Sequence, residues 1–224
     1  LPQSECNGGV FPGVYKHVWK GIVTLPSSCD SWVFSYEDCC RNSSQNLSGT
    51  GNDYYFETIL NSNTSPCNNS PVISGSPIPY SCINQPVIYN FGVFEPDGDS
   101  LFYSLVNALE DPGISVPYQF GYSGSSPING ISINSSTGEI TFTPTIQGNF
   151  VVVVLIEEFD SNGNLVGSIM QDFTFEIINC TTNFSPVPNP IGLLNLTGNS
   201  TQTSLFDIQA CEGDFLCFDL EFLD

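Results

Sequence analysis

Basic residues are nearly absent from this chain of 224 residues, in which three Lys and Arg stand against 23 Asp and Glu. The formal net charge is −20. A protein that holds phosphate backbones needs clustered cations, and a protein that docks on anionic lipid needs a basic face. Because only Lys16, Lys20 and Arg41 are available, the sequence excludes nucleic acid and anionic membrane as partners.

Long apolar runs are lacking as well. The longest, Phe150 to Ile156, has the length of a strand and falls far short of the roughly 18 residues that a membrane helix needs. Because the chain begins at Leu1 and not at Met, we expect a processed chain or a piece cut from a longer protein.

Catalytic groups have weak support. His17 is the single histidine, and no Gly-x-Ser-x-Gly motif accompanies it, so a Ser–His–Asp triad is disfavoured. A chain this acidic can hold a carboxylate pair for glycoside hydrolysis, yet modules of this size imply no deep cleft. We therefore predict a protein that is not an enzyme.

Cysteine, in contrast, is plentiful. The sequence contains no Cys-x-x-Cys motif, so disulfides in an oxidising compartment are favoured over zinc. The adjacent Cys39 and Cys40 are expected to point to opposite faces of a strand and to take different partners within the first 82 residues. Cys211 and Cys217 are expected to pair across a short turn. The nine candidates are Cys6, Cys29, Cys39, Cys40, Cys67, Cys82, Cys180, Cys211 and Cys217.

Alternating apolar and polar residues, bounded by turn residues, recur along the chain, and helical spacing is not sustained. We predict an all-β fold of tandem antiparallel β-sandwich domains, immunoglobulin- or cadherin-like, with disulfides. Asp160 to Asn164 is predicted to form a hairpin turn. The predicted strands are Val14 to Leu25, Ser31 to Glu37, Tyr54 to Leu60, Val87 to Phe94, Leu101 to Ala108, Ile131 to Ile133, Glu139 to Thr143, Asn149 to Phe159, Leu165 to Ile178, Leu205 to Gln209 and Phe215 to Phe222.

Shifts in composition suggest three segments. Asn61 to Pro79 is rich in Asn, Ser and Pro, and Asn179 to Pro190 has the composition of a stiffer linker. We therefore predict an N-terminal disulfide-containing β-domain at 1–72 and a cadherin-like or immunoglobulin-like sandwich at 73–180. Residues 181–224 are predicted to hold a linker and the start of a further, truncated β-domain.

An acidic loop is the sharpest local motif. Glu95, Asp97 and Asp99 place three carboxylates within five residues, where they repel one another unless solvent, donors or a cation compensates. Such hard oxygens on a tight loop suit Ca²⁺, with Asp160 as a further ligand and with Glu157 and Glu158 as other possible donors. The alternative is an Asp-Gly turn whose side chains bond nearby backbone amides. No cofactor is required under either interpretation.

A second motif combines aromatic and charged residues. Trp32, Phe34 and Tyr36 would share one face of a strand, either as part of the first domain's core, which we favour, or as a platform on which sugar rings stack. Arg41, the only arginine, is expected to form a buried ion pair with Glu37 or Asp38.

Several stretches together resemble the repeat regions of very large cell-surface proteins of gliding and related Bacteroidota. The resemblance covers about residues 6 to 180, and its middle segment is also similar to cadherin-like and immunoglobulin-like bacterial modules. The stretches that carry it are Leu25 to Asn42 with its Trp…Cys-Cys-Arg-Asn block, Asn69 to Pro71, Pro79 to Cys82, Pro96 to Leu105, Thr137 to Pro144, Val151 to Glu158, Gly167 to Ile169, Asp172, and Asn179 with Cys180.

This resemblance implies secretion across the outer membrane, tandem sandwich domains and a surface role in adhesion or gliding motility, with export by type IX secretion. The expected partners are neighbouring repeats of one long chain, identical chains in a filament or bundle, and a surface or polysaccharide ligand. The competing hypothesis is a carbohydrate-binding or accessory module of a secreted hydrolase.

Overall fold

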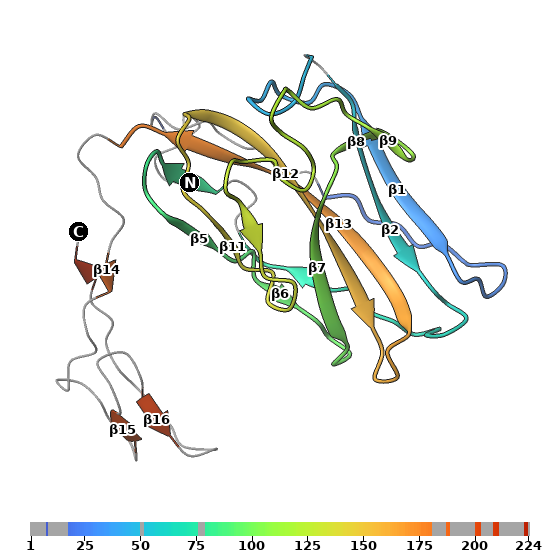
Figure 1. Ribbon diagram of the computed structural model, residues 1–224. Coiled ribbons are helices and arrows are strands. Elements are labelled where there is room, and N and C mark those ends of the chain that lie inside the picture. Colours follow the sequence, from blue (N-terminus) through green and yellow to red (C-terminus); the bar gives the residue numbers. More distant parts are fainter. Residues whose placement is uncertain are drawn as a thin grey trace.

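The computed structural model of the chain describes residue 8 and residues 18–49, 52–75, 79–180, 187–188, 200–202, 208–210 and 222–223. These residues contain strands and no helix, which confirms the predicted all-β class (Figure 1). The strands up to residue 180 are β1 (Trp32–Asp38), β2 (Tyr54–Leu60), β3 (Val72–Ile73), β4 (Tyr80–Cys82), β5 (Val87–Tyr89), β6 (Val93–Phe94), β7 (Ser100–Val106), β8 (Leu109–Asp111), β9 (Ile114–Ser115), β10 (Ser132–Ile133), β11 (Ile140–Phe142), β12 (Gly148–Phe159) and β13 (Leu165–Ile178).

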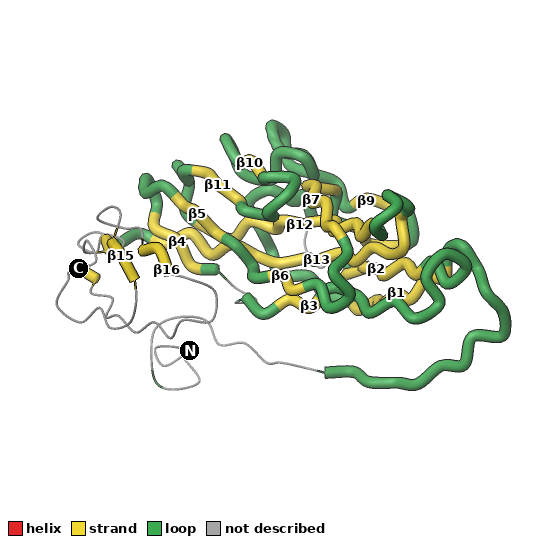
Figure 2. The backbone as a smooth tube through the Cα atoms, turned by 90° about the horizontal axis from the view of Figure 1, so that it is seen from below, coloured by secondary structure: helices red, strands yellow, loops and turns green. Residues whose placement is uncertain are grey.

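One large sheet dominates the structure. Its strands follow the order β7-β12-β13-β2-β8-β9, with β1 added beside β2 and β4 added beside β13. All of these pairs are antiparallel except β4 with β13. A smaller sheet, β10-β11-β5, and the β3–β6 pair pack against one face of it, because their apolar side chains belong to the same core cluster. Figure 2 shows where these strands lie along the backbone.

The core lies between these layers and follows from the alternation in β12 and β13. Phe150, Val152, Val154 and Ile156 of β12 point to one face, where they pack with Phe173, Phe175 and Ile177 of β13 and with β5 and β11. Val151 and Val153 point to the other face and pack with Leu47, Ala108 and Val116. Because both faces of β12 are covered, its continuous apolar run is buried.

The hairpin between β12 and β13 confirms the predicted turn. The amide of Asp160 donates to the carbonyl of Asn164, and Gly163 has a φ of 80°. The Asp160 carboxylate accepts hydrogen bonds from the amides of Asn162 and Asn164 at 2.9 and 2.8 Å. These local donors explain why Asp and Asn occupy the turn.

The structure differs from the predicted division at residue 72, which falls inside β3. β2 pairs with β13 through Gly167–Leu60, Ser168–Ile59 and Ile169–Thr58, so strands on both sides of that position share a sheet. Residues 18–180 are therefore described as one unit, whereas the division at residue 180 stays a prediction.

After residue 180, the described strands are β14 (Val187–Pro188), β15 (Ser200–Gln202), β16 (Ile208–Ala210) and β17 (Phe222–Leu223), with β14 paired to β17 and β15 to β16.

The Asn46 side chain forms hydrogen bonds with the backbone of β12 just beyond the end of β7. Its side-chain amide donates to the carbonyls of Pro127 and Val151 at 3.1 and 2.7 Å and accepts from the amide of Val151 at 3.0 Å. The residue is fully buried. The side chain thus replaces a missing strand partner, which satisfies backbone groups that burial would otherwise leave unpaired. Asn46 begins an Asn-x-Ser triplet, and its burial leaves no room for a glycan.

Some predicted strands differ from the structure. Residues 18–25 form no strand and pair with no other strand, and the apolar side chains that suggested one are largely exposed: Trp19 is 75% and Ile22 is 100% exposed. His17 and residues 14–17 lie outside the described part of the chain, as do most residues of the strands predicted after 205. The strand predicted over 87–94 is interrupted before Gly92, whose φ of 61° is a turn conformation. Among the described residues, no helix is long or apolar enough to cross a membrane.

Candidate functional site

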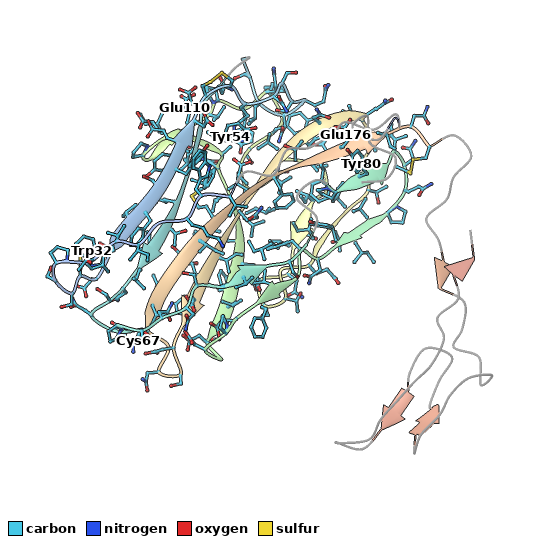
Figure 3. All side chains as sticks on the ribbon, turned by 180° about the vertical axis from the view of Figure 1, so that it is seen from behind. Trp32, Tyr54, Cys67, Tyr80, Glu110 and Glu176 are labelled. Atoms are coloured by element: carbon cyan, nitrogen blue, oxygen red, sulfur yellow. A yellow bond between two sulfur atoms is a disulfide. The ribbon has the colours of Figure 1, made fainter. Side chains whose placement is uncertain are left out.

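Three carboxylates converge at one end of the large sheet. Glu95 and Asp99 belong to the loop between β6 and β7, and Glu158 belongs to the end of β12. One carboxylate oxygen from each lies within 4.8 Å of the others. We call Glu95, Asp99 and Glu158 the acidic cluster. The same end carries Trp32 and Cys67, away from Tyr80 and Glu176 (Figure 3).

Strand pairing brings the cluster together. β7 runs antiparallel to β12 with Leu101 opposite Glu158 and Ser100 opposite Phe159, so the loop before β7 ends beside the last residues of β12. The Ser100 hydroxyl donates to the carbonyl of Phe159 at 3.2 Å. Within the loop, Gly98 has a φ of 83°, which gives the tight turn that carries Asp99 back toward Glu95.

Hydrogen bonds within the loop fix the Glu95 carboxylate. It accepts from the backbone amides of Asp97 and Asp99 at 3.0 and 2.6 Å. The loop is therefore folded around one of its own acidic side chains, as in the Asp-Gly turn that the sequence offered as an alternative. The carboxylate of Asp99 has a raised pKa, because burial and the neighbouring charge of Glu95 disfavour its ionised form.

Glu158 is the unusual member of the cluster because it is fully buried. It continues the inward-facing series Phe150, Val152, Val154 and Ile156 of β12, but places a carboxylate where that series has apolar groups. Gly167 lies opposite it on β13, and a Cβ at that position would lie 2.9 Å from Glu158 Oε2. The absence of a side chain at residue 167 thus makes room for the carboxylate.

The environment of Glu158 disfavours its charge. Burial raises the pKa of its carboxyl to about 7, the neighbouring Glu95 acts in the same direction, and a hydrogen bond from Asn68 opposes the shift. Asn68 Nδ2 donates to Oε2 at 2.7 Å, whereas Oε1 has no hydrogen-bond partner. A buried carboxylate with one unsatisfied oxygen is costly unless a proton or a cation compensates it.

Two of the four predicted metal ligands lie in the cluster and two do not. Asp97 Oδ2 accepts from the amide of Asn69 at 2.6 Å, and its Oδ1 accepts from that residue's side chain at 2.8 Å. Asp160 is engaged in its own hairpin turn, where Asn164 holds the pKa of its carboxyl below the usual value. Asp97 likewise has a lowered pKa because of Asn69. Glu158, which the sequence suggested only as a further possible donor, is the third member of the cluster.

The stability of the protein is expected to fall as pH rises when chelator removes divalent cations. The pKa of Glu158 in the fold is about 7 against an ordinary value of 4.5, so between these values the native state binds more protons than the unfolded state. Urea unfolding in EDTA from pH 5 to 8 should show this decrease, and Glu158→Gln should flatten it. A slope that is unchanged in Glu158→Gln would contradict the assignment to this residue.

Arg41 forms the predicted buried ion pair, but with a different partner. Its Nη1 lies 2.7 Å from Asp172 Oδ2 of β13, with side-chain exposures of 2% and 7%, whereas Glu37 and Asp38 are exposed. The guanidinium also lies 4.2 Å from the ring centroid of Tyr54. The expectation of Glu37 or Asp38 was wrong because both belong to the exposed edge strand β1, while the chain after Cys40 turns inward against β13.

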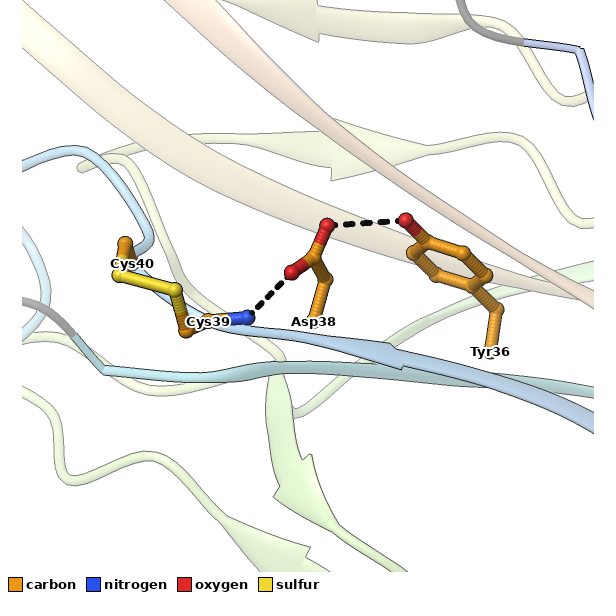
Figure 4. Close-up of a disulfide and its surroundings, with 4 residues drawn as sticks. All are labelled: Tyr36, Asp38, Cys39 and Cys40. Carbon is orange, nitrogen blue, oxygen red and sulfur yellow. Dashed lines mark hydrogen bonds between the residues drawn. A yellow bond between two sulfur atoms is a disulfide. The ribbon is translucent and has the colours of Figure 1, made fainter.

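The disulfides also differ from the predicted pattern. Cys39 and Cys40 bond to each other and not to separate partners (Figure 4). Cys40 has a φ of 75°, a turn conformation just after β1, so the two side chains do not alternate as they would within a strand. Asp38 accepts hydrogen bonds from the amide of Cys39 at 2.8 Å and from the hydroxyl of Tyr36 at 2.9 Å.

Of the remaining cysteines, Cys82 and Cys180 form the second disulfide, which joins the ends of β4 and β13. Cys29 and Cys67 were disulfide candidates, but both are free thiols in the structure. Cys6, Cys211 and Cys217 lie outside the described residues, so the predicted Cys211–Cys217 pair stays a prediction.

The three aromatic residues of β1 are not in the core, contrary to the interpretation favoured from sequence. Phe34 is 41% exposed, and Trp32 and Tyr36 are half-buried. Tyr36 stacks on Phe56 of β2 with ring centroids 5.3 Å apart, and the Trp19 ring centroid lies 6.4 Å from that of Tyr36. β1 is an edge strand among the described residues, because it pairs only with β2.

Comparison with known proteins finds a distant relative of part of the chain. Over an alignment of 151 residues, which covers 64% of this chain, it is 29% identical to Integrin beta-like protein A of Dictyostelium discoideum. That alignment spans 7% of the length of the relative. No family model matches the chain, and no solved structure matches it. Disulfides persist in oxidising compartments, so the two bonds and this similarity together indicate an extracellular domain.

Proposed function

We propose that this protein is a non-enzymatic extracellular module that extends a long cell-surface protein of adhesion type and presents its surfaces. The observation that carries the proposal is the similarity to an integrin beta-like protein, of which the chain matches a small part. A fold does not by itself imply a catalytic centre, because function resides in particular sites. In the proposed role the module would keep its shape under load while it presents surfaces.

The position of one disulfide supports a load-bearing role. Cys82 and Cys180 are 98 residues apart in sequence, and the bond joins the last residue of β4 to the chain just after β13. Tension between the two chain ends would pass from Cys82 to Cys180 through the bond. The residues from β5 to β13 could then not be extended by the load while the bond is intact.

The finer part of the proposal rests on the sequence resemblance. It holds that the parent protein is a repetitive adhesin of gliding Bacteroidota, exported by type IX secretion, in which neighbouring repeats or identical chains are the partners. The block from Leu25 to Asn42 is the most specific support. The excess of acidic residues, which gives a net charge of −20, would keep neighbouring chains apart in such an assembly.

The proposal is tested by deleting residues 18–180 in frame from the parent protein in the source organism. Surface display of the parent should persist, as an antibody to another region can verify on intact cells, while retention of cells on a surface under flow should fall at least several-fold. Complementation with the intact gene serves as the control. Unchanged retention with normal display would contradict an adhesive or extending role.

One observation favours a carbohydrate-binding module as the second candidate. The side chains of Trp32, Phe34 and Tyr36 share a face of an edge strand and remain partly exposed, which is how aromatic rings meet sugar rings. In the same experiment, soluble polysaccharide should then block retention, and a glycan array should detect binding that Phe34→Ala abolishes. Phe120→Ala, which removes another exposed ring, is the matched control. The absence of any glycan signal would remove this candidate.

A further inference from the structure

We propose that Glu95, Asp99 and Glu158 form a Ca²⁺ site that ties the β6–β7 loop to the end of β12. This inference does not depend on the proposed adhesive role, and its test reports on the site alone. It differs from the sequence-based expectation in its ligands, because Glu158 replaces Asp97 and Asp160.

The spacing of the oxygens fits this ion. Ca²⁺ binds oxygens at about 2.3–2.6 Å, so two ligands on opposite sides of one ion lie about 4.6–5.2 Å apart and neighbouring ligands lie closer. One oxygen of each cluster member lies within 4.8 Å of the others. The three carboxylates can therefore contact a single Ca²⁺ without a change in the backbone.

The buried Oε1 of Glu158 is the observation that points to a ligand rather than to a chance gathering of acids. The residue has no exposed surface, and this oxygen has no donor within the structure. Its neighbours in the cluster are two further carboxylates, which cannot donate when ionised. A cation bound among the three would satisfy the oxygen and offset the mutual repulsion.

Hydrogen bonds from the surrounding chain orient the side chains of the cluster before an ion binds. The Glu95 carboxylate is held by two backbone amides, Glu158 Oε2 is held by Asn68, and Gly167 leaves space beside it. Pre-oriented ligands lose less conformational freedom on binding, which favours affinity. Asn68 also has a buried Oδ1 without a partner, so a further neutral oxygen lies close to the cluster.

The donor set selects among cations. All three cluster ligands are carboxylates, with no Cys or His among them, which favours a hard ion over Zn²⁺. Mg²⁺ requires near-ideal octahedral geometry at about 2.0–2.1 Å, whereas Ca²⁺ tolerates irregular sets of six to eight oxygens. Three protein carboxylates, two from the β6–β7 loop and one from β12, suit the weak affinities of extracellular modules, about 10⁻⁴–10⁻³ M.

Binding would join three separate segments. Glu95 and Asp99 lie on the loop before β7, Glu158 lies on the large sheet, and Asn68 lies on the connection between β2 and β3. The ion would therefore tie the β6–β7 loop to the sheet, next to the β2–β3 connection that Asn68 already links to Glu158. The competing explanation is a proton that Glu158 shares with Glu95, which would satisfy the same oxygen without a metal.

The test uses the intact chain, freed of divalent ions, at pH 7.5 and constant ionic strength. Calorimetric titration with CaCl₂ should give a Kd of about 0.1–1 mM. At a Kd of 1 mM, 10 mM Ca²⁺ should raise the folding equilibrium constant about elevenfold, and MgCl₂ should raise it less. The absence of both heat and stabilisation at 10 mM Ca²⁺ would overturn the proposal in favour of the shared proton.

Variants locate the ion. Glu158→Gln and, should that variant not fold, Asp99→Asn should weaken Ca²⁺ binding at least tenfold. Two controls lose one acidic charge elsewhere: Asp97→Asn, in the same loop but bonded to Asn69, and Glu139→Gln, exposed on another loop. Both should bind within about twofold of the unaltered chain. Equal weakening in all four variants would show binding by net charge and not by the cluster.

Discussion

Replacing Arg41 with alanine is expected to lower the free energy of unfolding by about 3–5 kcal/mol, because it leaves Asp172 buried without its partner. The two side chains lie 2.7 Å apart and are almost fully buried. Burial raises the pKa of the Asp172 carboxyl, and the charge of Arg41 opposes that shift. Without the guanidinium, the ionised form of Asp172 is no longer stabilised. The variant also loses the contact with the Tyr54 ring.

Chemical denaturation of purified protein measures this effect. Lys20→Ala removes a different cation at an exposed site and should change stability by less than about 0.5 kcal/mol. The double variant Arg41→Met with Asp172→Leu should recover much of the loss, since apolar residues of similar volume can replace a buried ion pair. If Arg41→Ala were as stable as the unaltered chain, the pair would not be a structural element of the fold.

Opening the Cys82–Cys180 bond is the second change with a large expected effect. The two residues are 98 positions apart, and closing a loop of about this length removes about 4–5 kcal/mol of chain entropy from the unfolded state. Cys82→Ser with Cys180→Ser should therefore destabilise the protein by several kcal/mol. The Cys39→Ser with Cys40→Ser variant is the control, because that bond joins neighbours and closes almost no loop.

The same bond should be visible in single-molecule pulling. In the oxidised protein, the residues between Cys82 and Cys180 cannot extend, so the unfolding length should be shorter than in the reduced protein by roughly 320–350 Å, from 98 residues at full extension. An identical unfolding length with and without reductant would contradict the proposed path of the load.

The sequence predicted those parts of the fold that local patterns determine. β2 and β13 have the predicted bounds, because alternation and flanking turn residues mark a strand within its own segment. The turn at Asp160 to Asn164 was predictable for the same reason, since its hydrogen bonds are local. Short strands such as β3 and β9, with two residues each, carry no such pattern.

The site was only partly predictable, because its key contacts join distant segments. Glu158 reaches Glu95 through the register of β7 against β12, and Arg41 reaches Asp172 because β2 joins the sheet of β13. The composition of the Asn61 to Pro79 connection suggested a boundary between domains, yet a connection can also join two strands of one sheet. One signal was present in the sequence, because a Glu in phase with four apolar residues of β12 indicates a carboxylate on the buried face of that strand.

The central claim, an extracellular module of adhesion type, is tested most directly by retention of cells under flow after residues 18–180 are deleted from the parent protein. We expect the shortened parent to be displayed on the cell surface still, and retention to fall several-fold. Normal display with unchanged retention would contradict it.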